Sequence, residues 1–276
     1  MPSFCQVDVF SSEPLLGNPV AVVHDADGLD DETMARFARW TNLSETTFLL
    51  TPTVPGADYR LRIWTPGGEL PFAGHPTLGS AHAWLEAGGV AAGADVVQEC
   101  GAGLVRLARD DAGRLSFQAP PLMRSGPVDA GDLRAICRAL RIEESAIVAS
   151  TWIDNGPGWV GVQLADAASV LSLTPDFAAF GDLKIGVVGA YDEGPLAIEV
   201  RAFCPGYGMA EDPVTGSLNA GIGQWLAGDR LPASYVASQG TALGRAGRVH
   251  VRRDGDEVWV GGDTLTTIVG TVGLGL

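Results

Sequence analysis

Lysine is nearly absent from this chain of 276 residues, in which Lys184 is the single lysine among 18 basic residues. A lysine that forms a Schiff base or grips a phosphate would have to be this one, and no glycine-rich loop precedes it. Acidic residues number 33, and a formal charge of −15 leaves no basic footprint, so we expect no nucleic-acid partner. No apolar run reaches the roughly 18 residues of a membrane helix, so we expect no membrane association.

Cysteine is also scarce, and the spacing of the four cysteines excludes the common metal motifs. None belongs to a Cys-x-x-Cys pair, and no histidine stands at zinc-ligand spacing from them, so we expect no metal site. The pattern indicates free thiols in a reducing compartment, and the first residues lack a secretory signal, so the sequence predicts a cytoplasmic protein. The cysteines are Cys5, Cys100, Cys137 and Cys204.

Short segments of alternating polarity, separated by Gly, Pro, Asp and Asn, dominate the chain and predict many strands. Hydrophobic residues make up 46% of the sequence, which is typical of a globular protein. The expected strands cover about 4–10, 19–23, 59–64, 103–108, 114–118, 147–150, 160–164, 185–188, 197–203, 248–252 and 257–260. The expected helices cover 30–41, 76–87, 130–140 and 213–227.

One internal similarity organises this pattern. The sequence HPTLGS at residues 75–80 resembles DPVTGS at residues 212–217, which lies 137 residues later. In each half a strand ends at a proline, a glycine-containing loop follows, and a helix then begins. The chain therefore reads as two copies of one α+β unit, divided near the proline pair at residues 120–121.

The two expected helix starts are candidate anion sites. The first turn of a helix carries backbone N–H groups without intrahelical partners, and this end suits a carboxylate. Two such ends could face each other across a cleft and hold a small anionic substrate. The plainer interpretations are that Asp212 is an N-cap before Pro213 and that His75 is a loop histidine with satisfied hydrogen bonds.

Glu45 is a third candidate, because it lies in a strand-like segment where glutamate is disfavoured unless it faces water. It is either a solvated glutamate at a sheet edge or a general acid/base at the mouth of the same cleft. Three arginines, Arg60, Arg62 and Arg201, could be further carboxylate ligands, but we favour charges on strand surfaces.

Four motifs resemble the PhzF-like isomerases, named for phenazine biosynthesis, which share the diaminopimelate-epimerase fold. They are GNPVAV at 17–22, LSETTF at 43–48, ELPFAGHPTLGS at 69–80 and EDPVTGSLNA at 211–220. The resemblance implies an α+β fold of two pseudo-symmetric domains, each a curved, mostly antiparallel, barrel-like sheet around a central helix. We expect one domain at 1–118, completed by a strand at 265–276, and another at 119–264, with the active site between them.

The resemblance also implies roles for particular residues. Glu45 matches the glutamate that shuttles the proton, and His75 and Asp212 match polar residues that contact the substrate and help proton transfer. The segment of Gly216 and Ser217 matches the one that holds the substrate carboxylate. From the matching motifs we also expect Gly74 and Asn18 to bind the substrate. Homodimers are usual in the family, and its type member needs neither cofactor nor metal.

The sequence thus predicts a cofactor-independent isomerase that moves a proton on a small amino or cyclic carboxylic acid. Two alternatives remain open. Related epimerases use one thiol at each helix start, and no cysteine stands there in this chain, so an epimerase or racemase would have to use carboxylate and imidazole groups instead. A non-catalytic homodimeric binding protein on the same fold is the other alternative, since fold does not fix function.

Overall fold

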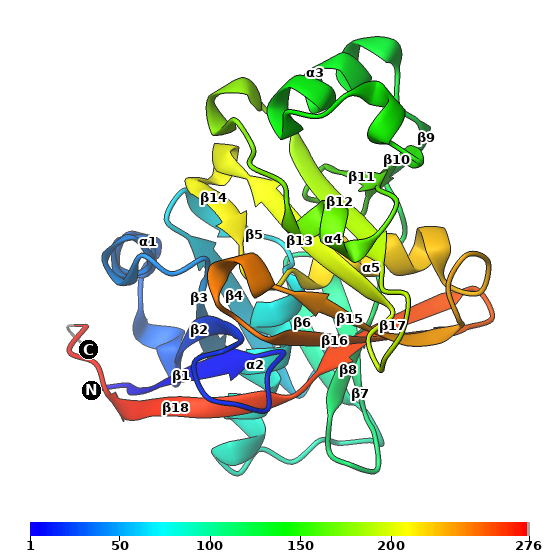
Figure 1. Ribbon diagram of the computed structural model, residues 1–276. Coiled ribbons are helices and arrows are strands. Elements are labelled where there is room, and N and C mark those ends of the chain that lie inside the picture. Colours follow the sequence, from blue (N-terminus) through cyan, green and yellow to red (C-terminus); the bar gives the residue numbers. More distant parts are fainter. Residues whose placement is uncertain (275–276) are drawn as a thin grey trace. The chain divides into compact units, whose positions relative to one another are not determined.

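A computed structural model describes residues 1–274 and divides the chain into two compact units (Figure 1). Unit 1 comprises Met1–Gln118 together with the C-terminal segment from Gly261, and unit 2 comprises Ala119–Val260. Each unit has its own series of paired strands and its own buried helix, so the two are described in turn.

Unit 1 is built on a sheet whose pairings are mostly antiparallel. Strand β1 pairs antiparallel with β2 and β18, β2 runs parallel to β3, β3 and β4 are antiparallel, and β4 runs parallel to β6, which leads into the antiparallel β7 and β8. Its elements are β1 (Ser3–Val9), β2 (Asn18–Val23), η1 (Ala26–Gly28), α1 (Asp31–Thr41), β3 (Thr46–Leu50), β4 (Tyr59–Thr65), β5 (Gly68–Leu70), α2 (Gly74–Glu86), β6 (Val96–Cys100), β7 (Gly103–Arg109), β8 (Leu115–Gln118) and β18 (Thr264–Thr271).

Helix α2 is the central helix of unit 1. It contacts strands β1, β2, β3, β4, β6, β8 and β18, and nine of its 13 residues are buried. Small residues make this enclosure possible, because a Cβ added at Gly79 would lie 2.4 Å from a methyl carbon of Val20. Ser80 of this helix is polar and buried, and its hydroxyl donates a hydrogen bond of 2.8 Å to the hydroxyl of Thr47 of β3. The strands that surround α2 thus hold its first turn in one position.

Unit 2 contains the second central helix, α5, which contacts β10, β11 and β16 and buries nine of its 11 residues. The chain returns to unit 1 within β17. The elements are β9 (Arg124–Pro127), α3 (Ala130–Leu140), η2 (Glu144–Ala146), β10 (Ala149–Asp154), β11 (Trp159–Gln163), α4 (Ala167–Leu171), η3 (Phe177–Ala179), β12 (Lys184–Ala190), β13 (Ile198–Cys204), η4 (Pro205–Tyr207), β14 (Met209–Asp212), α5 (Gly216–Leu226), β15 (Ser234–Gln239), η5 (Thr241–Leu243), β16 (Gly247–Asp254) and β17 (Glu257–Gly262).

The two units repeat one order of strand pairings. The antiparallel pair β1–β2, the parallel pair β2–β3 and the antiparallel pair β3–β4 correspond to β10–β11, β11–β12 and β12–β13. The parallel pair β4–β6 then corresponds to β13–β15. Helix α2 follows β5 as α5 follows β14. The repeat seen in the sequence is therefore a repeat of the fold, and the expected pair of pseudo-symmetric α+β units is confirmed.

The register of that repeat differs from the one in the sequence. Helix α2 begins at Gly74, two residues before the expected start at Pro76, and α5 begins at Gly216, three residues after the expected start at Pro213. His75 and Ser217 are therefore the second residues of their helices. The interpretation of Asp212 as an N-cap is wrong, because Asp212 ends strand β14, where it pairs with β13, and Thr215 holds the cap position. The counterpart of His75 is thus Ser217 and not Asp212.

The strand expected at 265–276 is β18, which runs antiparallel beside β1 (red and blue in Figure 1). The structure ends this strand at Thr271, and positions 275 and 276 of the expected range lie outside the described residues. Within residues 1–274, every helix is too short or too polar to cross a membrane.

Candidate active site

Glu45 and His75 lie side by side in unit 1. Glu45 directly precedes β3, and His75 lies in the first turn of α2. The carboxylate Oε2 of Glu45 is 3.5 Å from the imidazole Nε2 of His75, and the two side chains are 15% and 4% exposed. The interpretation of Glu45 as a solvated glutamate at a sheet edge is therefore wrong, because its carboxylate is mostly shielded from water and lies beside a buried imidazole.

Burial holds the imidazole of His75 in its neutral form. Desolvation lowers the pKa of His75 to about 3, although a hydrogen bond with the backbone of Pro19 acts in the opposite direction. Proline has no N–H, so its carbonyl must accept this bond. Nε2 has no hydrogen-bond partner among the described residues, so Nδ1 is the donor. The lone pair of Nε2 therefore faces Glu45, and this nitrogen can accept a hydrogen bond from the carboxyl group when that group carries a proton.

The motif at residues 17–19 contacts His75 through the backbone of Pro19. The backbone N–H of Gly17 donates to the carboxylate of Asp8 at 3.0 Å, which ties the motif to β1. A Cβ at Gly17 would lie 2.3 Å from the carbonyl oxygen of Val9, so only glycine fits. Asn18 follows as a fully buried residue that begins β2, next to the Pro19 that binds His75.

The first turn of α2 offers backbone donors beside the same residues. Its N-cap residue, Ala73, provides no side-chain cap, and the first hydrogen bond of the helix runs from Thr77 to Ala73. Gly74 and His75 therefore have N–H groups without an acceptor inside the helix. The structure thus brings together four residues that the sequence predicted: Glu45, His75, Gly74 and Asn18.

In unit 2 a network of side chains holds the loop between β14 and α5. The hydroxyl of Thr215 donates to the carboxylate of Asp212 at 2.6 Å. The side-chain amide of Gln239 donates to the carbonyl of Asp212 at 3.1 Å and accepts from the backbone N–H of Thr215 at 3.0 Å. Asn219 donates to both Gln239 and the carbonyl of Thr215, each at 2.9 Å. Thr215 and Gln239 therefore fix Asp212 directly, and Asn219 braces both of them.

Of this network, only Asp212 was predicted from the sequence. Thr215 and Asn219 lie inside the motif at 211–220, so that motif was a signal for both. Gln239 carried no signal, because it ends β15 far from any motif. The predicted residues Gly216 and Ser217 open α5 directly after this loop. In unit 2 the structure thus groups Asp212, Gly216 and Ser217 along one short segment.

Arg201 is not the surface charge that the sequence suggested. Its side chain is 7% exposed and forms a 2.8 Å ion pair with Glu211, the residue before Asp212. Its guanidinium also donates to the backbone carbonyls of Val170 and Leu173 at 3.3 and 2.8 Å. All seven residues of β13 are buried, because α4 packs on this strand, and a charge there needs partners.

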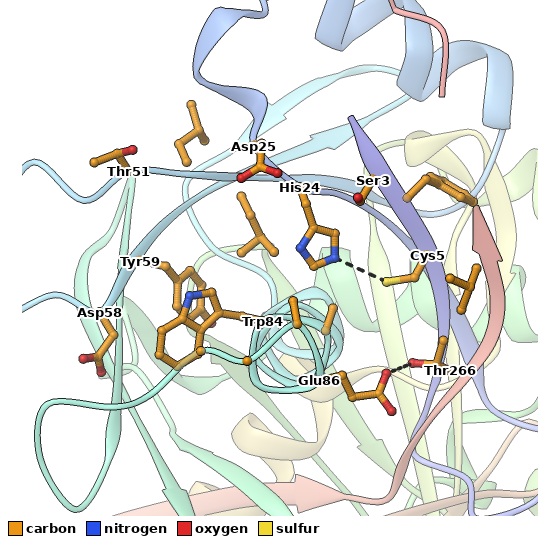
Figure 2. A pocket seen from close by; sticks show the side chains of 18 of the residues that line it. Ser3, Cys5, His24, Asp25, Thr51, Asp58, Tyr59, Trp84, Glu86 and Thr266 are labelled. Carbon is orange, nitrogen blue, oxygen red and sulfur yellow. Dashed lines mark hydrogen bonds between the residues drawn. The ribbon is translucent and has the colours of Figure 1, made fainter. Parts of the chain in front are cut away.

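A cavity of about 910 Å³ in unit 1 is a different place (Figure 2). It lies at the C-terminal end of α2, around Trp84, whereas His75 lies at the other end of this helix. Its lining contains no lysine or arginine, which makes it a poor site for an anion. Four carboxylates line it: Asp25, Asp27, Asp58 and Glu86.

The same cavity contains a thiol, but not a reactive one. Sγ of Cys5 lies 3.8 Å from Nε2 of His24 (Figure 2). Burial raises the pKa of the Cys5 thiol to about 11, and desolvation lowers the pKa of His24. A protonated thiol beside a neutral imidazole lacks the thiolate that nucleophilic chemistry needs.

Comparison with known sequences gives these residues a family context. The sequence profile of the phenazine biosynthesis-like proteins (PhzC-PhzF) matches residues 7–270. The chain is 38% identical over 288 residues to antisense-enhancing sequence 1 of Schizosaccharomyces pombe, and the match covers 97% of each chain. It is 36% identical over 270 residues to a trans-2,3-dihydro-3-hydroxyanthranilate isomerase of Pseudomonas aeruginosa, covering 92% of this chain and 91% of that enzyme.

The fold has a solved counterpart as well. A crystal structure of a PhzF-family phenazine biosynthesis protein from Bacillus anthracis matches with a TM-score of 0.83 at 23% sequence identity, and the match covers 98% of each chain. From the profile that spans most of its length and from these sequence identities, the chain belongs to the family of phenazine biosynthesis-like proteins.

Proposed function

We propose that this protein is an isomerase that moves a proton on a small amino or cyclic carboxylic acid, with Glu45 as the general acid/base. The observation that carries the proposal is the pair formed by the partly buried Glu45 and the buried His75, whose Oε2 and Nε2 atoms lie 3.5 Å apart. Relatives that are named isomerases support the reaction class. The proposal needs no cofactor, because a positioned carboxylate is sufficient for proton transfer from an acidic carbon.

The reaction balances without an oxidant. The carboxylate of Glu45 takes a proton from an acidic carbon of the substrate, and the bonding electrons stay in the conjugated system of the acid. Glu45 then returns the proton to another carbon. His75 assists at Nε2, where its neutral imidazole accepts a hydrogen bond from the carboxyl group of Glu45 while that group carries the proton. We assign Asn18 to substrate binding beside it.

We assign the substrate carboxylate to backbone N–H groups at Gly216 and Ser217, and to those at Gly74. Asp212 positions the substrate through its carboxylate, which the hydroxyl of Thr215 holds. A single carboxylate that both takes and returns the proton favours transfer on one face of the substrate. Epimerisation needs acid/base groups on two opposite faces, so we favour double-bond isomerisation.

The test is proton exchange followed by NMR in deuterated water. The protein is incubated with a panel of small amino and cyclic acids that includes trans-2,3-dihydro-3-hydroxyanthranilate, the substrate in the name of a relative. We expect deuterium at one carbon and a displaced double bond. Glu45→Gln should slow turnover by about 10²- to 10⁴-fold. The control Glu257→Gln changes an exposed glutamate on β17 and should have no effect.

Three outcomes would count against the proposal. Turnover by the Glu45→Gln variant at the wild-type rate would remove Glu45 from the mechanism. Deuterium at a stereocentre with inversion would support an epimerase instead. A protein that acids stabilise against heat, but that exchanges no proton with any of them, would be a binding protein.

A further inference from the structure

The first turn of α5 is held by two side chains, one from the turn between β10 and β11 and one from the first residue of β11. The indole N–H of Trp159 donates to the hydroxyl Oγ of Ser217 at 3.0 Å. The amide Nδ2 of Asn155 donates to the backbone carbonyl of the same serine at 2.9 Å. All three residues belong to unit 2, and Trp159 and Asn155 are 2% and 7% exposed. Two buried donors therefore meet on one residue.

The chemistry of the indole decides the direction of the hydroxyl. An indole nitrogen can only donate, so Oγ of Ser217 must act as the acceptor in this bond. The proton of the serine hydroxyl cannot point along the same line, and it remains available to another acceptor. A hydroxyl without this bond could rotate and act as acceptor or donor. Trp159 thus leaves the hydroxyl of Ser217 free to act as a hydrogen-bond donor, and a carboxylate needs donors.

A second observation at this place points to a ligand. The Oδ1 atom of Asn155 is buried and has no hydrogen-bond partner among the described residues. Its orientation is fixed, because Nδ2 must face the carbonyl of Ser217, and a flipped amide would bring two acceptors together. A buried acceptor therefore lies beside the donors of the first turn of α5. It suits the N–H or O–H group of an amino or hydroxy acid.

The turn that carries Asn155 and leads to Trp159 is held by hydrogen bonds of its own. The carboxylate of Asp154 accepts hydrogen bonds from the backbone of Gly156 and Gly158, both at 2.7 Å. Gly158 has a φ of +91°, a conformation that favours glycine. Trp159 then opens β11, directly after this turn. The indole is thus placed by a turn with two hydrogen bonds of its own.

Unit 1 uses the corresponding place in the same way. Strand β11 is the counterpart of β2, and Ser217 is the counterpart of His75. In unit 1 the backbone of Pro19, near the start of β2, fixes the tautomer of His75. In unit 2 the side chain of Trp159, at the start of β11, fixes the hydroxyl of Ser217. In both units a residue at or near the start of one strand, β2 or β11, thus decides which atom of the second helical residue donates a hydrogen bond and which accepts one.

We propose that Trp159 is a positioning residue that fixes Ser217 as a hydrogen-bond donor to the carboxylate of the substrate. The inference rests on the proposed function, because it takes the first turn of α5 as the place of the carboxylate. It goes further in naming a residue that acts through another one and never touches the substrate.

The test compares two tryptophans of unit 2. Trp159→Phe removes the N–H and keeps an aromatic ring. Trp152→Phe is the matched control, because Trp152 is also buried but its indole N–H has no hydrogen-bond partner among the described residues. The probes are 3-hydroxyanthranilate and 2-aminophenol, which differ only by the carboxylate. Dissociation constants are measured by calorimetry, and thermal unfolding monitors the stability of each variant.

We expect Trp159→Phe to weaken the binding of 3-hydroxyanthranilate by about 10- to 150-fold, the effect of one hydrogen bond to a charged group. Binding of 2-aminophenol should not change, and Trp152→Phe should change neither. With a turned-over acid, the variant should raise KM by a similar factor and leave kcat nearly unchanged.

A double-mutant cycle separates positioning from packing. If Trp159 acts through Ser217, then Trp159→Phe has no further effect on affinity in a Ser217→Ala background. Equal and additive losses in both backgrounds would show a packing role and overturn the inference. Equal wild-type affinity for the two probes would also overturn it.

The inference and the proposed function fail in different ways. Normal isomerisation by the wild-type protein with an unchanged KM in Trp159→Phe would overturn only the role of Trp159. Carboxylate-dependent binding that Trp159→Phe weakens, without proton exchange in the wild-type protein, would overturn only the isomerase proposal.

Discussion

Nε2 of His75 lies 3.5 Å from Oε2 of Glu45, while the carbonyl of Pro19 holds the other ring nitrogen. This arrangement fixes the tautomer of a neutral imidazole and turns its lone pair toward a carboxylate. When Glu45 carries a proton, its carboxyl group can therefore donate a hydrogen bond to this lone pair. The pair belongs to unit 1 alone, so its properties can be tested without knowledge of the substrate.

The stability of the protein should depend on pH through His75. Its pKa is about 3 in the folded state, against 6.5 for an ordinary histidine, so the unfolded state binds more protons between these values. The contribution of His75 to stability is fully present above pH 6.5 and is lost as the pH falls toward 3. The slope in this window approaches about 1.4 kcal/mol per pH unit.

Urea unfolding from pH 4 to 8 measures this dependence. The His75→Gln variant cannot take up this proton on unfolding, so it should lose less stability than the wild type as the pH falls below 6.5. Burial also lowers the pKa of His24 and His82, which contribute to both curves. The difference between the two curves therefore isolates the contribution of His75. Two parallel curves would contradict the assignment.

The ion pair of Arg201 and Glu211 should be costly to break. Arg201→Met leaves a buried carboxylate without its partner and should lower the free energy of unfolding by about 3–5 kcal/mol. The double variant Arg201→Met/Glu211→Leu should recover most of this loss. The control Arg252→Met breaks an exposed pair with Asp254 and should cost less than about 1 kcal/mol. Equal losses of unfolding free energy in Arg201→Met and Arg252→Met would contradict the expectation that the buried ion pair is the costlier one to break.

The enclosure of α2 predicts that a methyl group at position 79 is harmful. Alanine favours helices, but its Cβ at Gly79 would overlap Val20, and overpacking of this kind costs about 1–3 kcal/mol. Gly79→Ala should therefore lower the melting temperature. Gly270→Ala is the control, since no atom lies within 4 Å of a Cβ at that position. A Gly79→Ala variant as stable as the wild type would mean that α2 is less tightly enclosed.

The thiols should be dispensable for the reaction. Burial raises the pKa of Cys5 to about 11 and also raises the pKa of Cys100 and Cys137, so thiolates are rare at neutral pH. Treatment of the folded protein with iodoacetamide at pH 7 should leave the rate of proton exchange unchanged. Mass spectrometry identifies the modified residues. Loss of exchange in step with modification of one cysteine would indicate a thiol mechanism.

Local signals explain which elements the sequence predicted well. Helices α1 and α3 follow Asp30 and Asp129, whose carboxylates accept hydrogen bonds from the first turn, and each buries one apolar side. Strands with alternating residues, such as β4, were equally visible. Strand β15 and the short helix α4 were missed, because neither has a strong periodic pattern of its own.

The sequence alone determined the family likeness, the duplicated unit and the identity of the candidate site residues, because these depend on residue type and short spacing. Only the tertiary structure decided where the central helices begin, that Arg201 is buried, and that Gln239 and Trp159 support the candidate site. Trp159 and Ser217 are 58 positions apart in the chain. A contact of this kind depends on how strands pair and enclose a helix, and no local pattern of residues specifies it.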